Sequence, residues 1–366
     1  MLALGQLDGA LEHADASALR IFAARLVRDA LCSALRQEGH GFTDQRFQAW
    51  FAGLATLADT PPRGVRPPRV LCEAILTQLA HAGWPPLAAM AVNFGSALLA
   101  PRDLTSHGDH EQAHAAISNA RLLVTELAAE PGLPLAALAA LHDAVAASTR
   151  FAPAERGRAA IALDRHRKAI ERDAPPSPRW AVELLFGECL RAGGALRQAL
   201  PLPGIVRLDA LGAEGPAEAR TIRASALHEI ARDMAEKLRE AARLSRRAAQ
   251  RPAGVRGTSR APLLHEILAG FGAMRSAQIE SALGASRLGV RGMLATLEAM
   301  GVLERSTIAG VRLYSVSTTE RPALGADAPD GGFTFSSSAL DDYEASLASL
   351  DRLLARSDEG MPDKLP

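Results

Sequence analysis

The chain has 366 residues, of which 48% are apolar and 22% are charged, as is ordinary for a soluble globular protein of two or three domains. Its formal net charge is zero, which excludes a global field that attracts nucleic acid or anionic lipid, so any such attraction must come from local clusters. Aromatic residues make up only 4%, and the abundance of Ala, Leu and Arg favours helices over extensive sheet.

The sequence indicates a cytoplasmic protein. Its first residues, "MLALGQLDGALEHADAS", contain no basic segment followed by a long apolar run, so we expect no secretory signal. The most apolar stretch, 85–101, is interrupted by Asn93 and Gly95 and is too short to span a bilayer, so no membrane association is expected. Cys32, Cys72 and Cys189 are far apart in apolar settings, which predicts buried free thiols.

Apolar residues recur at helical spacing through most of the first 250 residues. After helical patterns over 16–57, the Pro- and Gly-rich stretch "DTPPRGVRPPR" predicts an extended connector over 59–69. Further helices are expected over 70–82, 86–99, 109–129, 134–148, 153–172 and 179–200, bounded by Pro or Gly. The paired glycines Gly193 and Gly194 are expected to end or kink a helix.

A long amphipathic helix is expected from about 217 to 250. Its apolar stripe is formed by Ile222, Leu227, Ile230, Met234, Leu238, Ala241 and Ser245. Basic residues outnumber acidic ones over 232–260, and the segment 251–260, which contains Arg256 and Arg260, reads as a basic linker. This helix is also our candidate for a dimer interface.

The stretch 261–317 carries the motif on which the functional prediction depends. After a first short helix over 262–270, Ser276 is expected to cap a second helix, and Gly284 supplies the positive φ of a tight turn. Ser286 is expected to cap a third helix that ends at Gly301 and buries Val290, Met293, Leu294, Leu297 and Met300. This spacing is typical of a helix-turn-helix, although Glu280 stands where a small residue is usual.

Two short strands, "VLERS" and "VRLYSV", follow the third helix and predict a β-wing with Gly310 at its bend. The start of the third helix presents arginines, which suit guanine edges and phosphates. The residues expected to contact double-stranded DNA are Arg275, Ser286, Arg287, Gly289, Arg291 and Arg312, with Arg256 and Arg260 of the linker. The alternative for such a module is protein binding without DNA.

Residues 178–317 resemble a family of uncharacterised, often plasmid-borne alphaproteobacterial proteins. In that family, a helical region similar to the Fic fold precedes a C-terminal helix-turn-helix. The matching stretches are "RWAVELLFGECLRAGGALRQALPLPGIVRLDAL", the long basic helix, and "ESALGASRLGVRGMLATLEAMGVLE". The resemblance implies a DNA-binding regulator without established catalysis. The Fic motif HPFxxGNGR does not occur in the chain, so AMPylation is not expected.

An HExxH pattern occurs at His110-Glu111-Gln112-Ala113-His114. In a zinc hydrolase the two histidines would share one helix face as ligands, and Glu111 would polarise the zinc-bound water. The approach to the motif is polar, and no residue stands out as a third ligand, so we interpret the match as fortuitous and keep the hydrolase as an alternative. No cofactor or small-molecule ligand is indicated.

We therefore expect a mainly α protein with a C-terminal winged helix-turn-helix and a small β-wing, acting as a homodimeric, DNA-binding regulator of transcription or of a plasmid-associated process. The predicted organisation is a helical domain over 1–173, a helical region over 174–250, a basic linker over 251–260, the winged helix-turn-helix over 261–317, a flexible linker over 318–338, and an acidic amphipathic helix and tail over 339–366.

Overall fold

A computed structural model describes residues 2–59, 65–101, 107–129, 132–153, 158–161, 170–173, 176–250 and 260–317. The described residues form one compact unit, which ends at Ser317. The predicted flexible linker over 318–338 and acidic helix over 339–366, as well as Arg256, lie outside the described residues.

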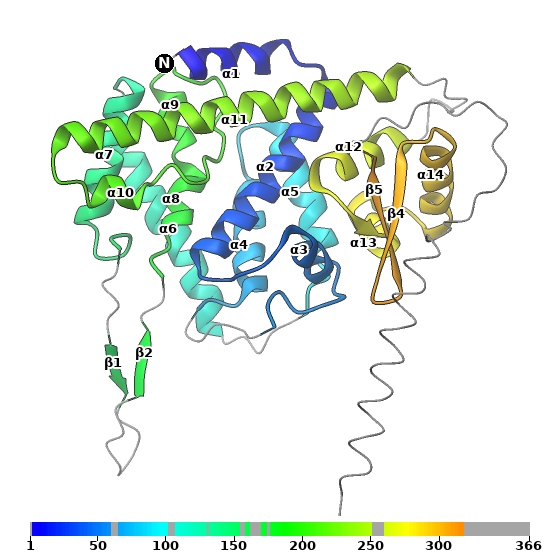
Figure 1. The fold of residues 1–366 in the computed structure, drawn as a ribbon, viewed down its shortest axis with the longest axis horizontal. Coiled ribbons are helices and arrows are strands. Elements are labelled where there is room, and N and C mark those ends of the chain that lie inside the picture. The colour runs from blue at the N-terminus through cyan, green and yellow to red at the C-terminus, as the bar shows by residue number, and fades with distance from the viewer. Residues whose placement is uncertain are drawn as a thin grey trace, which may run out of the picture. The chain divides into compact units, whose positions relative to one another are not determined.

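The unit is mainly helical, as predicted. Helices and strands follow in the order α1 (Leu2–His13), α2 (Ala16–Gln37), α3 (Asp44–Phe51), α4 (Pro68–Ala80), α5 (Pro85–Ala97), α6 (His107–Ala129), α7 (Pro134–Ala147), β1 (Arg158–Ile161), β2 (Ile170–Asp173), α8 (Arg179–Leu185), α9 (Gly187–Ala192), α10 (Leu208–Leu211), α11 (Pro216–Gln250), α12 (Ala261–Phe271), β3 (Met274–Arg275), α13 (Ser276–Leu283), α14 (Arg287–Ala299), β4 (Leu303–Ile308) and β5 (Val311–Val316). Figure 1 shows this arrangement.

Helix α2 is the central element of the core. It packs against α4, α5, α8, α11 and α12, and its apolar face, including Ile21, Phe22 and Leu31, is fully buried. Asp15 begins the helix by accepting a hydrogen bond from the Ala18 amide at 2.8 Å. Elements distant in the sequence therefore meet on one helix.

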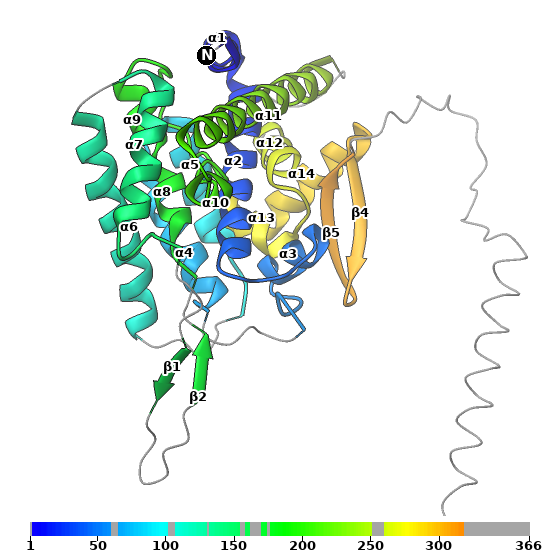
Figure 2. The ribbon, with the colours of Figure 1, turned by 60° about the vertical axis from the view of Figure 1, so that its left-hand side comes forward.

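The predicted long helix is present as α11, which crosses the unit beside α1 (Figures 1 and 2). Its apolar stripe, including Leu227, Met234 and Leu238, is buried, and α11 packs on α1 and α2 of the same chain. The outward side chains of its C-terminal half are mostly charged, such as Arg239 and Arg243. The stripe that suggested a dimer interface is thus covered within the protomer.

Two local predictions about helices are wrong. The segment expected to be helical over 153–172 contains β1 and β2, which pair antiparallel with Arg158 opposite Asp173 and Ile161 opposite Ile170. The helix expected over 179–200 is divided into α8 and α9 and ends at Ala192. The end of α9 at Ala192 agrees with the separate prediction that Gly193 and Gly194 end or kink a helix, since Gly194 has a φ of 68°.

The three cysteines are buried free thiols, as predicted. Burial raises the pKa of the Cys32 thiol to about 12 and that of the Cys189 thiol to about 11. These thiols are therefore not reactive nucleophiles at neutral pH.

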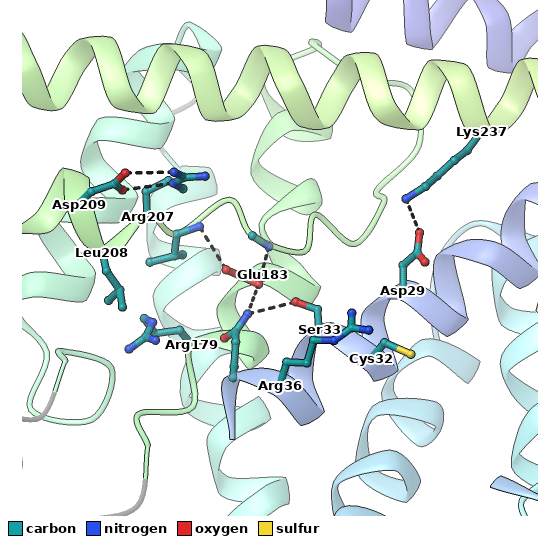
Figure 3. Close-up of a pocket in the computed structure, with 13 residues that line it drawn as sticks. Asp29, Cys32, Ser33, Arg36, Arg179, Glu183, Arg207, Leu208, Asp209 and Lys237 are labelled. Atoms are coloured by element: carbon teal, nitrogen blue, oxygen red, sulfur yellow. Dashed lines mark hydrogen bonds and ion pairs between the residues drawn. The ribbon is translucent and has the colours of Figure 1, made fainter. Parts of the chain in front are cut away.

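A cleft of about 760 Å³ opens beside the C-terminal half of α2 (Figure 3). It is lined by α2 residues such as Ser33 and Arg36, by Arg179 and Glu183 of α8, by the segment 204–209, and by Lys237 of α11. No sequence pattern indicated a binding site at this cleft.

Candidate nucleic-acid interface

The predicted turn between two helices is formed by residues 284–286. Gly284 ends α13 in the left-handed conformation, with φ 55° and ψ 39°, and the Ala285 amide donates to the Glu280 carbonyl at 3.1 Å. Ser286 then caps α14 by accepting a hydrogen bond from the Gly289 amide at 3.2 Å. Both features agree with the sequence-based prediction.

The cap of α13 differs from the prediction. Arg275, not Ser276, is the N-cap residue, and its backbone amide donates to the Gln278 side chain at 3.1 Å. The other end of Gln278 points into the core, where its Nε2 donates to the carbonyls of Phe51 and Ala97 at 3.2 and 3.1 Å. The Gln278 side chain therefore satisfies the amide of the N-cap residue and also connects α13 to the helical body.

Helix α14 has one buried face and one exposed face. Val290, Met293, Leu294 and Leu297 are buried as predicted, whereas Met300 is only partly buried. On the other face, Arg287, Leu288, Gly289 and Arg291 are exposed. Arg287 and Arg291 form no hydrogen bond or ion pair with any residue that the structure describes, so their guanidinium groups face solvent.

A three-stranded antiparallel sheet adjoins α14, with the strand order β3–β5–β4. The β4–β5 hairpin turns at Ala309 and Gly310, both of which have positive φ values. Arg312 on β5 is exposed, and Arg305 on β4 forms an ion pair with Glu298 of α14. This exposed ion pair, which we did not predict, adds a contact between the hairpin and the helix.

The predicted contact residues are not all presented in the same way. Ser286, Arg287, Gly289 and Arg291 share the exposed start of α14. Arg275 is half-buried, and its Nε is buried without a partner among the described residues. Arg260 donates to the Leu283 carbonyl at 2.8 Å, so part of its hydrogen-bonding capacity stabilises the end of α13.

One exposed residue at this surface escaped the sequence analysis. Leu288 is 79% exposed and lies between Arg287 and Gly289 at the start of α14. The signal was available, since a leucine on the polar face of an otherwise amphipathic helix breaks the pattern that burial alone would produce.

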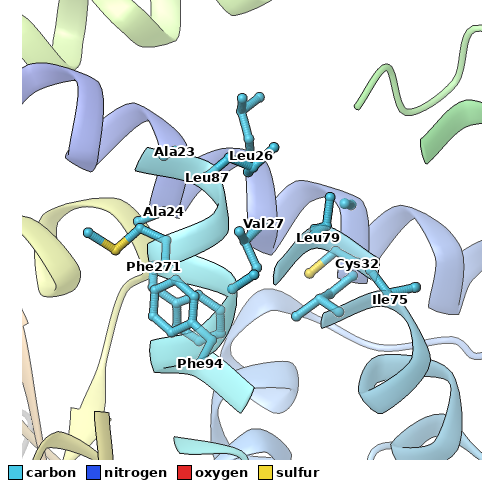
Figure 4. Close-up of a cluster of buried hydrophobic side chains, with 14 of the residues drawn as sticks. Ala23, Ala24, Leu26, Val27, Cys32, Ile75, Leu79, Leu87, Phe94 and Phe271 are labelled. Atoms are coloured by element: carbon cyan, nitrogen blue, oxygen red, sulfur yellow. The ribbon is translucent and has the colours of Figure 1, made fainter. Parts of the chain in front are cut away.

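Helix α12 fixes this segment to the body of the protein. Both carboxylate oxygens of Glu266, which is almost fully buried, accept from Arg20 at 2.6 and 2.7 Å, and this pairing raises the pKa of Arg20. Phe271 stacks on Phe94 with ring centroids 4.1 Å apart, and Figure 4 shows the two rings beside Ala24. Residues 261–317 therefore share a core with the N-terminal helices.

The HEQAH motif lies near the start of α6, and the helix agrees with the spacing considered for a zinc ligand pair. Glu111 and His114 are exposed, and His110 is half-buried. Within the described part of the chain, no group of three or more His, Cys, Asp or Glu residues is placed to hold a metal ion.

No helix among the described residues is long and apolar enough to cross a membrane.

Two comparisons with known proteins found no match. No protein-family model matches the chain, and no curated protein is significantly similar to it. The resemblance of residues 178–317 to the plasmid-borne family therefore stays a prediction.

Proposed function

We propose that residues 261–317 form a winged helix-turn-helix and that the protein binds double-stranded DNA through it. In this proposal α12, α13 and α14 are its three helices, β4 and β5 are its wing, and α14 enters the major groove. The order helix, strand, helix, helix, strand, strand supports this assignment, as does the central position of β5 in the sheet.

The observation that carries the proposal is the exposed start of α14. Arg287 and Arg291 are one helical turn apart, so both project from the same side of the helix, away from the buried face. An arginine can donate two parallel hydrogen bonds to a guanine edge or to a phosphate. In this proposal the exposed Arg312 of β5 adds a phosphate contact of the kind that positions a protein on the duplex.

One such module reads few base pairs, so the proposal includes a homodimer that binds two half-sites. The surface that joins the protomers is not the apolar stripe of α11, because that stripe is buried in its own chain. The proposed biological role is cytoplasmic regulation of transcription or of a plasmid-associated process, as the family resemblance implies.

The test measures the affinity of the protein for a labelled mixed-sequence duplex by fluorescence anisotropy over a range of salt concentrations. Replacing Arg287 and Arg291 by Ala together should weaken binding by at least about tenfold, because each lost charged contact costs about 1–3 kcal/mol. The salt slope should also fall by about 0.9 for each phosphate contact removed. Arg191→Ala, which removes an exposed arginine of α9, is the matched control and should change neither quantity.

A protein partner is the second candidate, and the exposure of Leu288 favours it, since apolar side chains anchor protein interfaces. The two candidates give different results. Absence of duplex binding, or duplex binding that is insensitive to salt and to the double arginine substitution, would overturn the DNA proposal and favour a protein partner. A genome-wide DNA pull-down would identify the sequence recognised.

A further inference from the structure

The cleft beside α2 brings together basic and acidic side chains from four parts of the chain. Its cations are Arg36, Arg179, Arg207 and Lys237, and its carboxylates are Asp29, Glu183 and Asp209. Small-molecule sites of this size usually combine an apolar lining with a few convergent polar groups, and Cys32, Val206 and Leu208 supply apolar surface here.

Each carboxylate of the cleft is already satisfied. Asp29 accepts from Lys237 at 2.6 Å, and Asp209 accepts from Arg207 at 3.2 and 3.0 Å. The buried Glu183 turns both oxygens toward protein donors. These groups therefore have little capacity left for a cationic ligand.

Glu183 organises the wall of the cleft. Its carboxylate accepts from the backbone amides of Gly204 and Val206 at 2.8 and 3.2 Å and from Gln37 at 2.6 Å. The next amide, that of Arg207, donates to Nε2 of the buried His142 at 3.1 Å. Two buried side chains thus hold the segment 204–207 in place, and Figure 3 shows this segment beside Glu183.

Arg179 is the cation of the cleft that has no ion pair among the described residues. Its side chain has one hydrogen-bond partner there, the Ser177 hydroxyl at 2.7 Å, although a guanidinium has five N–H donors. Burial lowers the pKa of Arg179 although the charges of Glu183 and Glu38 raise it, which means that the guanidinium is partly dehydrated. Arg36, on the facing helix, pairs with Asp44 at 3.2 Å, but both side chains are more than half exposed, so this pair is weak.

We propose that this cleft binds a small anion bearing a phosphate or carboxylate group, held by Arg179 and Arg36. A bidentate contact with Arg179 would use donors that the protein leaves unpaired, and it would restore the solvation that burial removes. To provide a second contact, Arg36 leaves its exposed partner Asp44 and the Phe42 ring, whose centroid lies 5.0 Å from its guanidinium carbon; both are weak surface contacts.

Occupancy of the cleft is also expected to affect DNA binding, a step that rests on the function proposed above. Helix α2 carries Arg36 near its C-terminal end, and Arg20 nearer its N-terminal end binds Glu266 of α12. Helix α2 therefore connects the cleft to the helix that attaches the proposed DNA-binding segment to the body.

The test uses the full chain and measures binding of inorganic phosphate, pyrophosphate and citrate by isothermal titration calorimetry and by thermal shift. Saturable binding of at least one probe is expected. Arg179→Gln should weaken it by at least about tenfold, the loss typical of a charge-assisted hydrogen bond. Arg36→Gln, at an exposed position, should also weaken it and serves if Arg179→Gln does not fold. The exposed Arg191→Gln should leave affinity unchanged.

Absence of saturable binding for all three probes would overturn the proposal, as would equal affinities for Arg36→Gln, Arg179→Gln and the wild type. Equal weakening by Arg191→Gln would show that only net charge matters, with the same consequence. Retained anion binding without any effect on the affinity for duplex DNA would refute the coupling alone. Absence of duplex binding by the anion-free protein, with anion binding retained, would contradict the proposed function and leave the cleft assignment standing.

Discussion

The packing of α12 on α2 leads to a prediction about Gly270. A Cβ atom at this position would overlap with the Ala24 Cβ and with the carbonyl oxygen of Ile21, and it would lie 3.3 Å from the Arg25 amide nitrogen. Two of these three atoms belong to the backbone of α2, so no side-chain rotation relieves the overlap. Gly270→Ala therefore requires α12 to move away from α2.

The expected cost follows from two opposing effects. Overpacking a core site costs about 1–3 kcal/mol, and a backbone clash belongs at the upper end of that range. Replacing Gly by Ala in a helix returns at most about 1 kcal/mol. The net loss in the free energy of unfolding should thus be about 2 kcal/mol, measured by urea unfolding followed by far-UV circular dichroism.

Gly95→Ala is the matched control. Gly95 is exposed within α5, and a Cβ there meets no atom within 4 Å, so the same substitution should stabilise the protein by about 0.5–1 kcal/mol. If Gly270→Ala proves as stable as Gly95→Ala, then α12 does not pack against α2 as closely as the structure has it, and the shared core of residues 261–317 would be wrong.

Three further predictions concern buried groups. Burial raises the pKa of Glu183 from 4.5 to about 7, so its contribution to the free energy of unfolding, about 3 kcal/mol, is lost as pH rises from 4.5 to 7. Glu183→Gln should remove this part of the pH dependence of unfolding, and an unchanged pH profile would contradict the prediction. Burial lowers the pKa of His142 below 6.5, so stability from its bond with the Arg207 amide is lost as pH falls below 6.5. NMR should show a ring that is less than half protonated at pH 6.5, and a ring half-protonated at or above that pH would refute this. A double-mutant cycle with Arg20→Ala and Glu266→Ala should give a coupling of about 1–2 kcal/mol, whereas a value near zero would mean that this partly exposed pair adds nothing.

Helix positions were predicted well where the chain contains strong local signals. Pro68, Pro85 and Pro134 each stand at the first position of a helix, where the missing amide hydrogen has no intrahelical acceptor to lose. The turn at Gly284 and the cap at Ser286 are likewise set by neighbouring residues. Such features depend on a few consecutive residues, so a single sequence is enough to find them.

The errors occur where the outcome depends on residues far along the chain. The break between α8 and α9 involves Gly187, where a Cβ would overlap with the backbone of Leu200. Strands β1 and β2 exist through pairing with one another, which helix propensity at each position does not reveal. The cleft was missed for the same reason, because Arg36, Arg179 and Lys237 are brought together only by the tertiary fold.

The composition of α14 is poorly explained by folding alone. Leu288 is 79% exposed, so its side chain gains little from burial. Gly292 lies in the interior of the same helix, where a Cβ would meet no atom within 4 Å, yet glycine there costs about 0.5–1 kcal/mol relative to alanine. A glycine that weakens a helix without relieving a clash is expected where another molecule must approach the helix closely. Gly292 directly follows Arg291, and the arginines of this exposed face favour a partner with a negatively charged surface, in agreement with the DNA-binding function proposed for α14.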